Sequence, residues 1–413
     1  MKLISLAWRN VWRRKRRTLI TASSIGFGVL LSATFTGMAL YMYGNMIDAS
    51  ASTGFGHITI SAVGYNKTPT LDKRISTTDE LREKLIREQG VADAMVRIMG
   101  QAMFASAVKS VGGMFLAIDP SQETEKYNLL IRLIKQGNVF TDKDGTGVVV
   151  GNKLAEKLNL KLGKKLVYTT TDVNGEIVSE IARVSGVFST GVAEIDGGLV
   201  LLPIDRVRNV LGYEKDEATL LAVMLDNQRK ADDIRHRLSE KLDLKRQEAL
   251  TWRDTQADLA GMITIDGASN YISQLLVALL ISAGVLNTLL MSVLERTREF
   301  GVMMALGMSA RQLFKLVLFE SVWLALIGLV VGVMITSPWY WYLDVYGLDF
   351  SAMLSGEDYS VAGVLVDPIV RVKLYIETVV IILSVVFTLA ILSGVYPAWR
   401  AGRIPPIESL RNI

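Results

Sequence analysis

The segment from residue 295 to residue 321, ERTREFGVMMALGMSARQLFKLVLFES, holds the side chains best suited to chemistry. It follows an uncharged run at 267–294 and mixes charged with large apolar groups, namely Glu295, Arg296, Arg298, Glu299, Phe300, Met303, Met304, Leu306 and Met308. Side chains three and four residues apart share one side of a helix, so this segment offers ion pairs and apolar contact to a partner protein. The pattern predicts a docking element, not a catalytic centre.

A solvated connector is the alternative interpretation of this segment. Short cytoplasmic loops of membrane proteins are rich in basic residues, which accounts for Arg296, Arg298, Arg311 and Lys315. This alternative does not account for Phe300 and the methionines that lie between them. We therefore favour docking, and we expect the charges of Arg296 and Glu299 to be exposed.

Catalytic, metal and nucleotide chemistry finds little support in the sequence. The chain has no cysteine, and its two histidines, His57 and His236, lack the spacing of metal ligands. The glycines of DGTGVVVGNKLA fit no dinucleotide fingerprint, and LKLGKKL lacks the upstream glycine of a phosphate-binding loop. DKDG resembles half a calcium loop but lacks the remaining ligands, so we interpret these segments as turns. We expect His57 to begin a strand and His236 to lie on a solvated helix. We expect no catalytic residue, cofactor or metal in this chain and no nucleic-acid partner.

Transmembrane helices must position the docking segment, because the chain is too apolar for an average soluble enzyme. Of its 413 residues, 50% are hydrophobic and 21% are charged, and the mean hydropathy is +0.32. A helix rises about 1.5 Å per residue, so roughly 20 apolar residues cross a bilayer core of about 30 Å. Four uncharged runs reach this length: 18–47, 267–294, 321–343 and 378–399.

Basic residues beside the first run orient the helices. Before residue 18 all charged residues are basic, whereas most charged residues of the segment 344–372 are acidic. Basic residues favour the cytoplasmic side, so the N-terminus is predicted to be cytoplasmic. The predicted organisation is an amphipathic cytoplasmic helix at 1–17, transmembrane helices at 18–47, 267–294, 316–343 and 373–396, an external domain at 48–266, a cytoplasmic segment at 295–315, an external loop at 344–372 and a cytoplasmic tail at 397–413.

A cleaved signal peptide is the competing interpretation of the N-terminus, because Ala49-Ser50-Ala51 resembles a cleavage site. The apolar region of a signal peptide has about 7–15 residues, and the run at 18–47 is much longer. We therefore expect the first helix to remain as an anchor. The preceding residues, LISLAWRNVWRR, predict an amphipathic helix along the inner leaflet.

The domain at 48–266 is predicted to be α+β. Runs rich in β-branched residues, bounded by turn residues, predict strands at 57–61, 147–151, 165–172, 177–188, 198–203 and 220–226. Helices are predicted at 79–89, 152–159 and 228–243. Asn174-Gly175 predicts a hairpin turn. We expect a β-rich lobe at 111–211 inserted into an α/β lobe formed by 48–110 and 212–250.

The predicted spans show packing features and no transport site. Their uncharged cores leave Asn287 as the most polar group, which we expect to make a packing contact across helices. Glycines that permit close helix approach are Gly26, Gly28, Gly328 and Gly332.

Two motifs resemble a known family. The first runs from 287 to 309, NTLLMSVLERTREFGVMMALGMS, and the second from 396 to 411, YPAWRAGRIPPIESLR. Together with AWRNVWRRKRRTL near the N-terminus and VVVGNKLAEKLNLKLGKKL in the outer domain, they look like the FtsX/MacB-type permeases of ABC transporters. The resemblance covers the whole chain and is nearest in plan to the lipoprotein-releasing permeases.

The resemblance implies a mechanotransmitting permease of the bacterial inner membrane, with its large domain in the periplasm. Such a permease pairs with a second copy or a homologue and with two copies of a separate ATPase, which would bind ATP and Mg. Residues 295–309 match the family's ATPase-coupling element. The implied cargo is a lipoprotein or another amphiphile, with membrane lipid and a periplasmic chaperone or adaptor as further partners. A macrolide-exporter-like efflux permease and a non-transporting regulator of a periplasmic enzyme stay open as alternatives.

Overall fold

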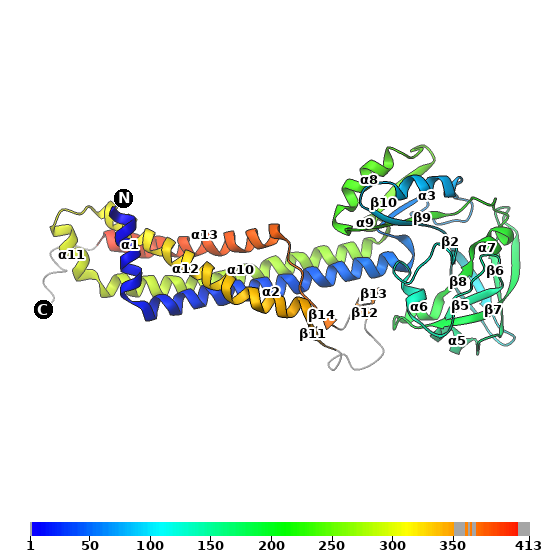
Figure 1. Ribbon diagram of the computed structural model, residues 1–413, viewed down its shortest axis with the longest axis horizontal. Coiled ribbons are helices and arrows are strands. Elements are labelled where there is room, and N and C mark those ends of the chain that lie inside the picture. Colours follow the sequence, from blue (N-terminus) through cyan, green and yellow to red (C-terminus); the bar gives the residue numbers. More distant parts are fainter. Residues whose placement is uncertain (1, 351–359, 362–363, 366–368, 404–413) are drawn as a thin grey trace. The chain divides into compact units, whose positions relative to one another are not determined.

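A computed structural model describes residues 2–350, 360–361, 364–365 and 369–403 (Figure 1). The chain divides into two compact units. The first holds Met1–Met42, Thr264–Asp349 and Ile369–Ile413, and the second holds Tyr43–Ile263 and Phe350–Pro368. Parts of the predicted loop at 344–372, of the predicted tail at 397–413 and of the motif at 396–411 lie outside the described residues.

Long helices build the first unit. Its elements are α1 (Lys2–Arg13), α2 (Lys15–Ser50), α10 (Ala257–Glu295), α11 (Thr297–Ala305), α12 (Ala310–Val345) and α13 (Ile376–Gly402), with a small antiparallel pair of β11 (Leu348–Asp349) and β14 (Ile369–Val370). Within the described residues, four helices are long and apolar enough to cross a membrane, and they are α2, α10, α12 and α13. This confirms the predicted four-helix membrane class, although each helix differs by several residues from its predicted span.

Aromatic side chains lie at two levels along α12. In the first half of α12, Trp323 meets Trp8 of α1 with ring centroids 4.7 Å apart. Near its end, Trp339 stacks on Tyr342 with centroids 5.9 Å apart. Trp323 and Trp339 are separated by roughly 24 Å of helix, which approaches the thickness of a bilayer core. Tryptophan and tyrosine favour both membrane interfaces, so their positions agree with a membrane-spanning α12.

Glycines bring α2 and α12 into close contact. A Cβ added at Gly332 would lie 3.2 Å from Gly26 Cα, and one added at Gly328 would lie 2.7 Å from Ile25 Cβ. Backbones can approach this closely only where no side chain intervenes. The predicted small-residue contact is therefore present. Asn287, in contrast, is exposed on α10, so among the described residues it is not buried between helices as expected.

Gly328→Ala is expected to lower the free energy of unfolding by about 1–3 kcal/mol, because overpacking forces the two helices apart. Ile25 Cβ is attached directly to the backbone and cannot rotate away from the added methyl group. Gly284→Ala is the matched control, since nothing lies within 4 Å of a Cβ added there. Thermal unfolding of the purified variants in detergent measures both effects, and equal midpoints would contradict the tight α2–α12 contact.

The second unit contains a mixed sheet of ten strands with short helices. Its elements are η1 (Ala51–Phe55), β1 (Ile58–Ala62), α3 (Thr78–Ile86), β2 (Val91–Ala105), β3 (Ser110–Ile118), α4 (Leu129–Arg132), β4 (Ile134–Gly137), β5 (Gly147–Gly151), α5 (Asn152–Lys157), β6 (Lys165–Thr171), β7 (Ile177–Phe188), α6 (Ala193–Gly198), β8 (Leu199–Pro203), α7 (Ile204–Leu211), β9 (Leu220–Leu225), η2 (Gln228–Lys230), α8 (Ala231–Ser239), β10 (Gln247–Thr251) and α9 (Trp252–Thr255), with a separate pair of β12 (Ser360–Val361) and β13 (Val364–Leu365). All six predicted strands are present within one or two residues of their predicted ends. This confirms the predicted α+β class.

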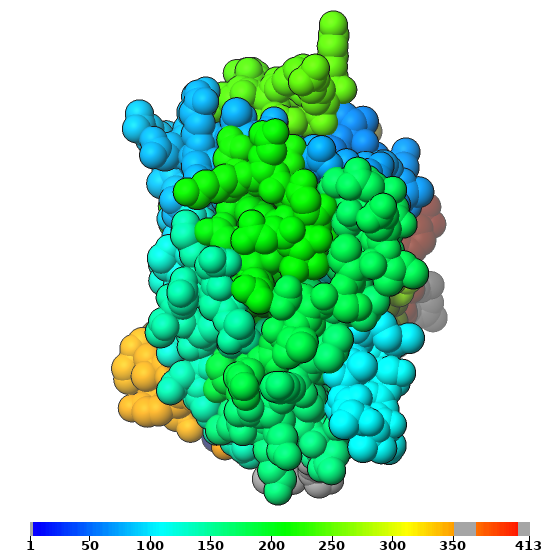
Figure 2. Space-filling model, turned by 90° about the vertical axis from the view of Figure 1, so that its right-hand side faces the viewer, coloured from blue at the N-terminus to red at the C-terminus, as the bar shows by residue number. Residues whose placement is uncertain are grey.

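One sheet runs through both predicted lobes. Its strand order is β10-β1-β9-β2-β3-β8-β5-β7-β4, and β6 pairs with β2 and β7. The 15-residue strand β2 pairs with β9 through Val91–Arg97 and with β3 through Arg97–Ala105, so it joins the two regions. Figure 2 shows a face of this unit formed mainly by segments from the middle of the sequence, coloured cyan to green.

Local turn chemistry explains the hairpin between β6 and β7. Gly175 has φ of +83°, a conformation that glycine adopts without steric cost. The Asp172 carboxylate accepts hydrogen bonds from the backbone N–H groups of Asn174 and Glu176, each at 2.8 Å. The strands pair antiparallel from Lys165 opposite Arg183 to Thr171 opposite Ile177. The hairpin predicted at Asn174-Gly175 is therefore confirmed.

Candidate functional site: a short helix held by an ion-pair network

The predicted docking segment forms a short helix, a turn and the start of α12. Arg296 interrupts the helical conformation between α10 and α11, with φ of −109° and ψ of 16°. After α11, Gly307 adopts φ of +97° and turns the chain. Ser309 then caps α12 through a reciprocal pair of hydrogen bonds with Gln312. The sequence LGMSARQ thus ends one helix and begins the next.

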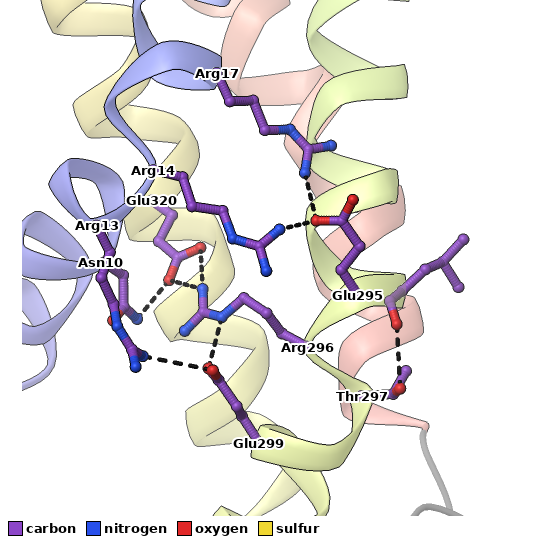
Figure 3. A network of polar contacts seen from close by, with 10 residues as sticks. Asn10, Arg13, Arg14, Arg17, Glu295, Arg296, Thr297, Glu299 and Glu320 are labelled. Carbon is purple, nitrogen blue, oxygen red and sulfur yellow. Dashed lines mark hydrogen bonds and ion pairs between the residues drawn. The ribbon is translucent and has the colours of Figure 1, made fainter. Parts of the chain in front are cut away.

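A buried ion pair fixes the beginning of α11 (Figure 3). Arg296 is 7% exposed and Glu320 of α12 is 6% exposed. The Nη1 of Arg296 donates to Glu320 Oε1 at 3.1 Å, and its Nε donates to Glu299 Oε2 at 2.9 Å. The Nδ2 of Asn10, on α1, donates to Glu320 Oε1 at 2.7 Å. Three helices therefore meet at one carboxylate.

Exposed ion pairs surround this buried pair. Arg13 Nη1 lies 3.5 Å from Glu299 Oε1, and Arg17 Nη1 lies 3.1 Å from Glu295 Oε2, while Arg14 also pairs with Glu295. The hydrogen bond from the Arg296 guanidinium lowers the pKa of the Glu299 carboxyl below its usual value. Exposed pairs stabilise a protein by about 0–1 kcal/mol each, so these outer pairs contribute to the orientation of α11 and add little to the free energy of unfolding.

Apolar contacts fix the inner side of α11. Phe300 is 1% exposed and packs with Ala7 of α1, Leu313 of α12 and Ala398 of α13. The Arg296 guanidinium lies over the Phe300 ring, 5.2 Å from its centroid. The methionines of the segment, which are Met303, Met304 and Met308, are half-buried and pack against the same cluster. The inner side of α11 is therefore part of the core formed by the helices of the first unit.

A stripe of exposed side chains covers the outer side of α11. Arg298 is exposed, Val302 is 43% exposed and Leu306 is 84% exposed. These residues follow one another at intervals of four, so they lie along one side of the helix. We call Arg298, Val302 and Leu306 the outer stripe.

Family models match both parts of the chain. The model described as MacB-like periplasmic core domain matches residues 18–241, and the one described as FtsX-like permease C-terminal matches residues 271–406. The first alone covers more than half of the chain. The chain belongs to the FtsX/MacB family of ABC transporter permeases. The outer stripe and the ion-pair network lie within the C-terminal match of this permease, except for Asn10, Arg13, Arg14 and Arg17.

The permease resembles proteins with different cargo names. It is 25% identical to the lipoprotein-releasing system transmembrane protein LolC of Xylella fastidiosa, over 78% of this chain and 81% of that protein. It is 23% identical to the uncharacterized ABC transporter permease MJ1507 of Methanocaldococcus jannaschii, over 99% of this chain and 98% of the other. The pyoverdine export ATP-binding/permease protein PvdT of Pseudomonas fluorescens is 22% identical, over 100% of this chain and 59% of PvdT.

The chain also resembles part of a solved ABC-type transporter structure. The extracellular domain of the noncanonic ABC-type transporter YknZ from Gram-positive bacteria covers 47% of this chain and 99% of that domain, with 16% identity and a TM-score of 0.34.

The predicted site residues of the permease fall into three groups. Exposed residues are Glu295, Arg298 and Leu306, partly exposed ones are Glu299, Met303, Met304 and Met308, and buried ones are Arg296 and Phe300. The expectation that Arg296 is an exposed charge is wrong, because Glu320 neutralises it inside the helical core. Phe300 likewise packs inside the protein and is not presented to a partner. The ATPase-coupling role of the segment stays a prediction.

Sequence reasoning missed residues that complete the site. They are Asn10, Arg13, Arg14, Arg17, Val302 and Glu320. Glu320 gave a usable signal, because it lies inside the third predicted span at 316–343, where a carboxylate is costly and needs a partner. The arginines gave no sequence signal beyond the orientation of the helices, since the positive-inside rule already accounts for basic residues near the N-terminus.

Proposed function

We propose that this permease transmits the motion of a separate ATPase to its periplasmic domain and thereby extracts or moves a lipoprotein or another amphiphilic cargo. Two ATPase copies, which bind ATP and Mg, dock on the cytoplasmic side of a permease pair in the bacterial inner membrane. The cargo assignment rests on the LolC-type relatives and on the four-helix plan. The network of α11 with α1 and α12 lies on the cytoplasmic side in this proposal.

The outer stripe is the single observation that carries the coupling proposal. An exposed valine and leucine on the same side of a short helix, next to an exposed arginine, offer apolar area that a docked partner protein removes from water. Arg298 on the same side adds a charge for an ion pair across the contact. Because Arg296 and Phe300 anchor the opposite side of α11 in the helical core, a force on the outer stripe passes directly to α12 and α1.

Leu306→Asp is expected to reduce ATP hydrolysis by the assembled transporter at least about tenfold, because it places a charge in the apolar centre of the contact. The folded permease should keep its stability within about 0.5 kcal/mol, since Leu306 is an exposed side chain. The measurement is vanadate-sensitive ATP hydrolysis by the tagged complex, purified from its native membranes, beside thermal unfolding of the permease.

Leu244→Asp is the matched control, because Leu244 is a 64% exposed leucine of the second unit. It should leave ATP hydrolysis unchanged. Full ATP hydrolysis by the Leu306→Asp complex would contradict docking at the outer stripe.

Efflux of a small molecule is the second candidate function. It is favoured by similarity to PvdT, whose name describes pyoverdine export, and to the macrolide export protein MacB of Syntrophobacter fumaroxidans, which is 30% identical over 43% of this chain and 22% of MacB. Mass spectrometry of the tagged permease purified in mild detergent separates the candidates. A bound lipoprotein supports extraction, whereas a periplasmic adaptor without lipoprotein supports efflux.

A further inference from the structure

A small polar cavity lies inside the ion-pair network of the first unit (Figure 3). Its volume is about 200 Å³, and it is bounded by α1, α2, α10 and α12 together with the turn before α11. Four guanidinium groups line it, those of Arg13, Arg14, Arg17 and Arg296. Such a convergence of guanidinium groups is the usual protein arrangement for binding phosphate oxygens.

The carboxylates of the network do not balance these arginines. Glu299 and Glu320 line the cavity, and Glu295 pairs with Arg14 and Arg17 beside it. Four guanidinium groups therefore face three carboxylates, which leaves an excess positive charge. Further exposed cations are Arg9 on α1 and Lys15 and Arg16 on α2. An anion entering the cavity would thus meet a positive field.

One buried donor of the network lacks an acceptor. Arg296 is more than nine-tenths buried, and its Nε and Nη1 donate to Glu299 and Glu320. Its Nη2 is buried and has no hydrogen-bond partner among the described residues. In Figure 3 this nitrogen is turned away from both carboxylates, toward Asn10 and Arg13. Leaving a charged donor unpaired in the interior is costly, so the cavity calls for an acceptor oxygen at this position.

The level of the cavity along the helices suggests the source of that oxygen. Trp323 of α12 lies one turn beyond Glu320 and contacts Trp8 of α1, and tryptophan favours the interfacial layer of a bilayer. Leu289 and Leu324 line the same cavity, so it adjoins the apolar part of the helices. Lipid phosphates occupy this layer, next to the acyl chains. A single water would pair with Nη2 but would not offset the excess charge.

We propose that this cavity binds a phosphate-type oxyanion, supplied by the headgroup of an anionic lipid, among the four guanidinium groups that line it, those of Arg13, Arg14, Arg17 and Arg296. The bound phosphate accepts from Arg296 Nη2 and joins α1 and α2 to the beginning of α11. The inference goes beyond the proposed function, because it does not depend on the cargo or on the ATPase. It makes the geometry of α11 sensitive to the lipid composition of the membrane.

The test compares two double variants of the full-length permease. Arg14→Gln with Arg17→Gln removes two cavity cations, whereas Lys15→Gln with Arg16→Gln removes the same charge from neighbouring positions that do not line the cavity. Native mass spectrometry in detergent, titrated with phosphatidylglycerol and separately with phosphatidylcholine, measures lipid retention. The cavity variant should bind phosphatidylglycerol about tenfold more weakly, and the control variant less than about twofold. An equal loss in both variants would show diffuse attraction and would overturn the site.

Two further arms keep the result interpretable. Ser292→Met adds volume at the cavity wall without changing a charge, and it should also weaken phosphatidylglycerol binding while the arginines stay in place. Thermal unfolding shows whether each variant is folded. Inorganic phosphate is the probe for the other source of the oxyanion. Phosphate that displaces phosphatidylglycerol only at high concentration supports the lipid assignment, whereas tight phosphate binding without a preference for phosphatidylglycerol would overturn it.

Discussion

Replacing Glu320 by alanine is expected to lower the free energy of unfolding by about 3–5 kcal/mol, because the substitution leaves a buried guanidinium without its main counter-charge. Arg296 lies over Phe300 beside the apolar cluster of α12 and α13, and water in the adjoining cavity does not supply the lost counter-charge. Asn10 loses its acceptor at the same time. Thermal and denaturant unfolding of the purified permease in detergent measure the change.

Glu295→Ala is the matched control for this prediction. Glu295 also pairs with arginines, but its side chain is 36% exposed, so its loss should cost at most about 1 kcal/mol. The double variant Arg296→Met with Glu320→Leu should recover most of the stability, since apolar groups of similar size replace a buried pair at little cost. A Glu320→Ala variant as stable as Glu295→Ala would contradict the buried pair.

The rescued double variant also separates stability from coupling. It restores the packing of α11 but removes the polar link between α11, α12 and α1. If that link only stabilises the fold, ATP hydrolysis by the complex should return together with stability. If the link sets the angle at which α11 presents the outer stripe, stability should return and ATP hydrolysis should stay low.

The membrane helices were predictable because the bilayer imposes a strict requirement on composition. An uncharged run such as 267–294 has few alternatives to a spanning helix, and α10 contains all of it. The strands of the second unit were predictable for a local reason as well. Runs such as GVVVG at 147–151 combine β-branched residues with flanking turns, and β5 has the same bounds.

The longest strand of the sheet was not predictable from its own residues. The sequence of β2, VADAMVRIMGQAMFA, has more alanine, glycine and methionine than β-branched residues, which favour strands, and it carries an arginine near its centre. Pairing with β9, β3 and β6 makes it a strand, and β9 and β6 lie far away in the sequence. The burial of Arg296 has the same origin, since Glu320 is 24 residues away and Asn10 lies on α1.

The arginine at the centre of β2 leads to the second large effect. Arg97 and Glu123 have fully buried side chains and form a two-pronged ion pair, with Nε to Oε1 at 2.6 Å and Nη2 to Oε2 at 2.9 Å. The remaining nitrogen of Arg97, Nη1, donates to the carbonyl oxygen of Gly54 at 2.7 Å. Gly54 belongs to η1, the turn that directly continues α2. Arg97 therefore ties the end of the first membrane-spanning helix to the central strand.

Arg97→Met is expected to lower the free energy of unfolding by about 3–5 kcal/mol, because Glu123 would stay buried without its counter-charge. Amide hydrogen exchange should accelerate at 51–57, where the Gly54 carbonyl loses its donor, and this local change is the distinctive readout. Arg97→Lys keeps the charge but offers no planar fork, so it should give an intermediate loss.

Arg206→Met is the control for this second prediction, since Arg206 and Glu180 form a pair of similar length, 2.7 Å, with side chains 33% and 29% exposed. Its cost should be at most about 1 kcal/mol, and exchange at 51–57 should not change. In the proposed mechanism, motion of α2 reaches the sheet through this contact. If the Arg97→Met permease stays folded, exchanges normally at 51–57 and supports full transport, Arg97 does not transmit motion. If it stays folded and hydrolyses ATP normally but exchanges fast at 51–57 and no longer transports cargo, transmission is interrupted between α2 and β2.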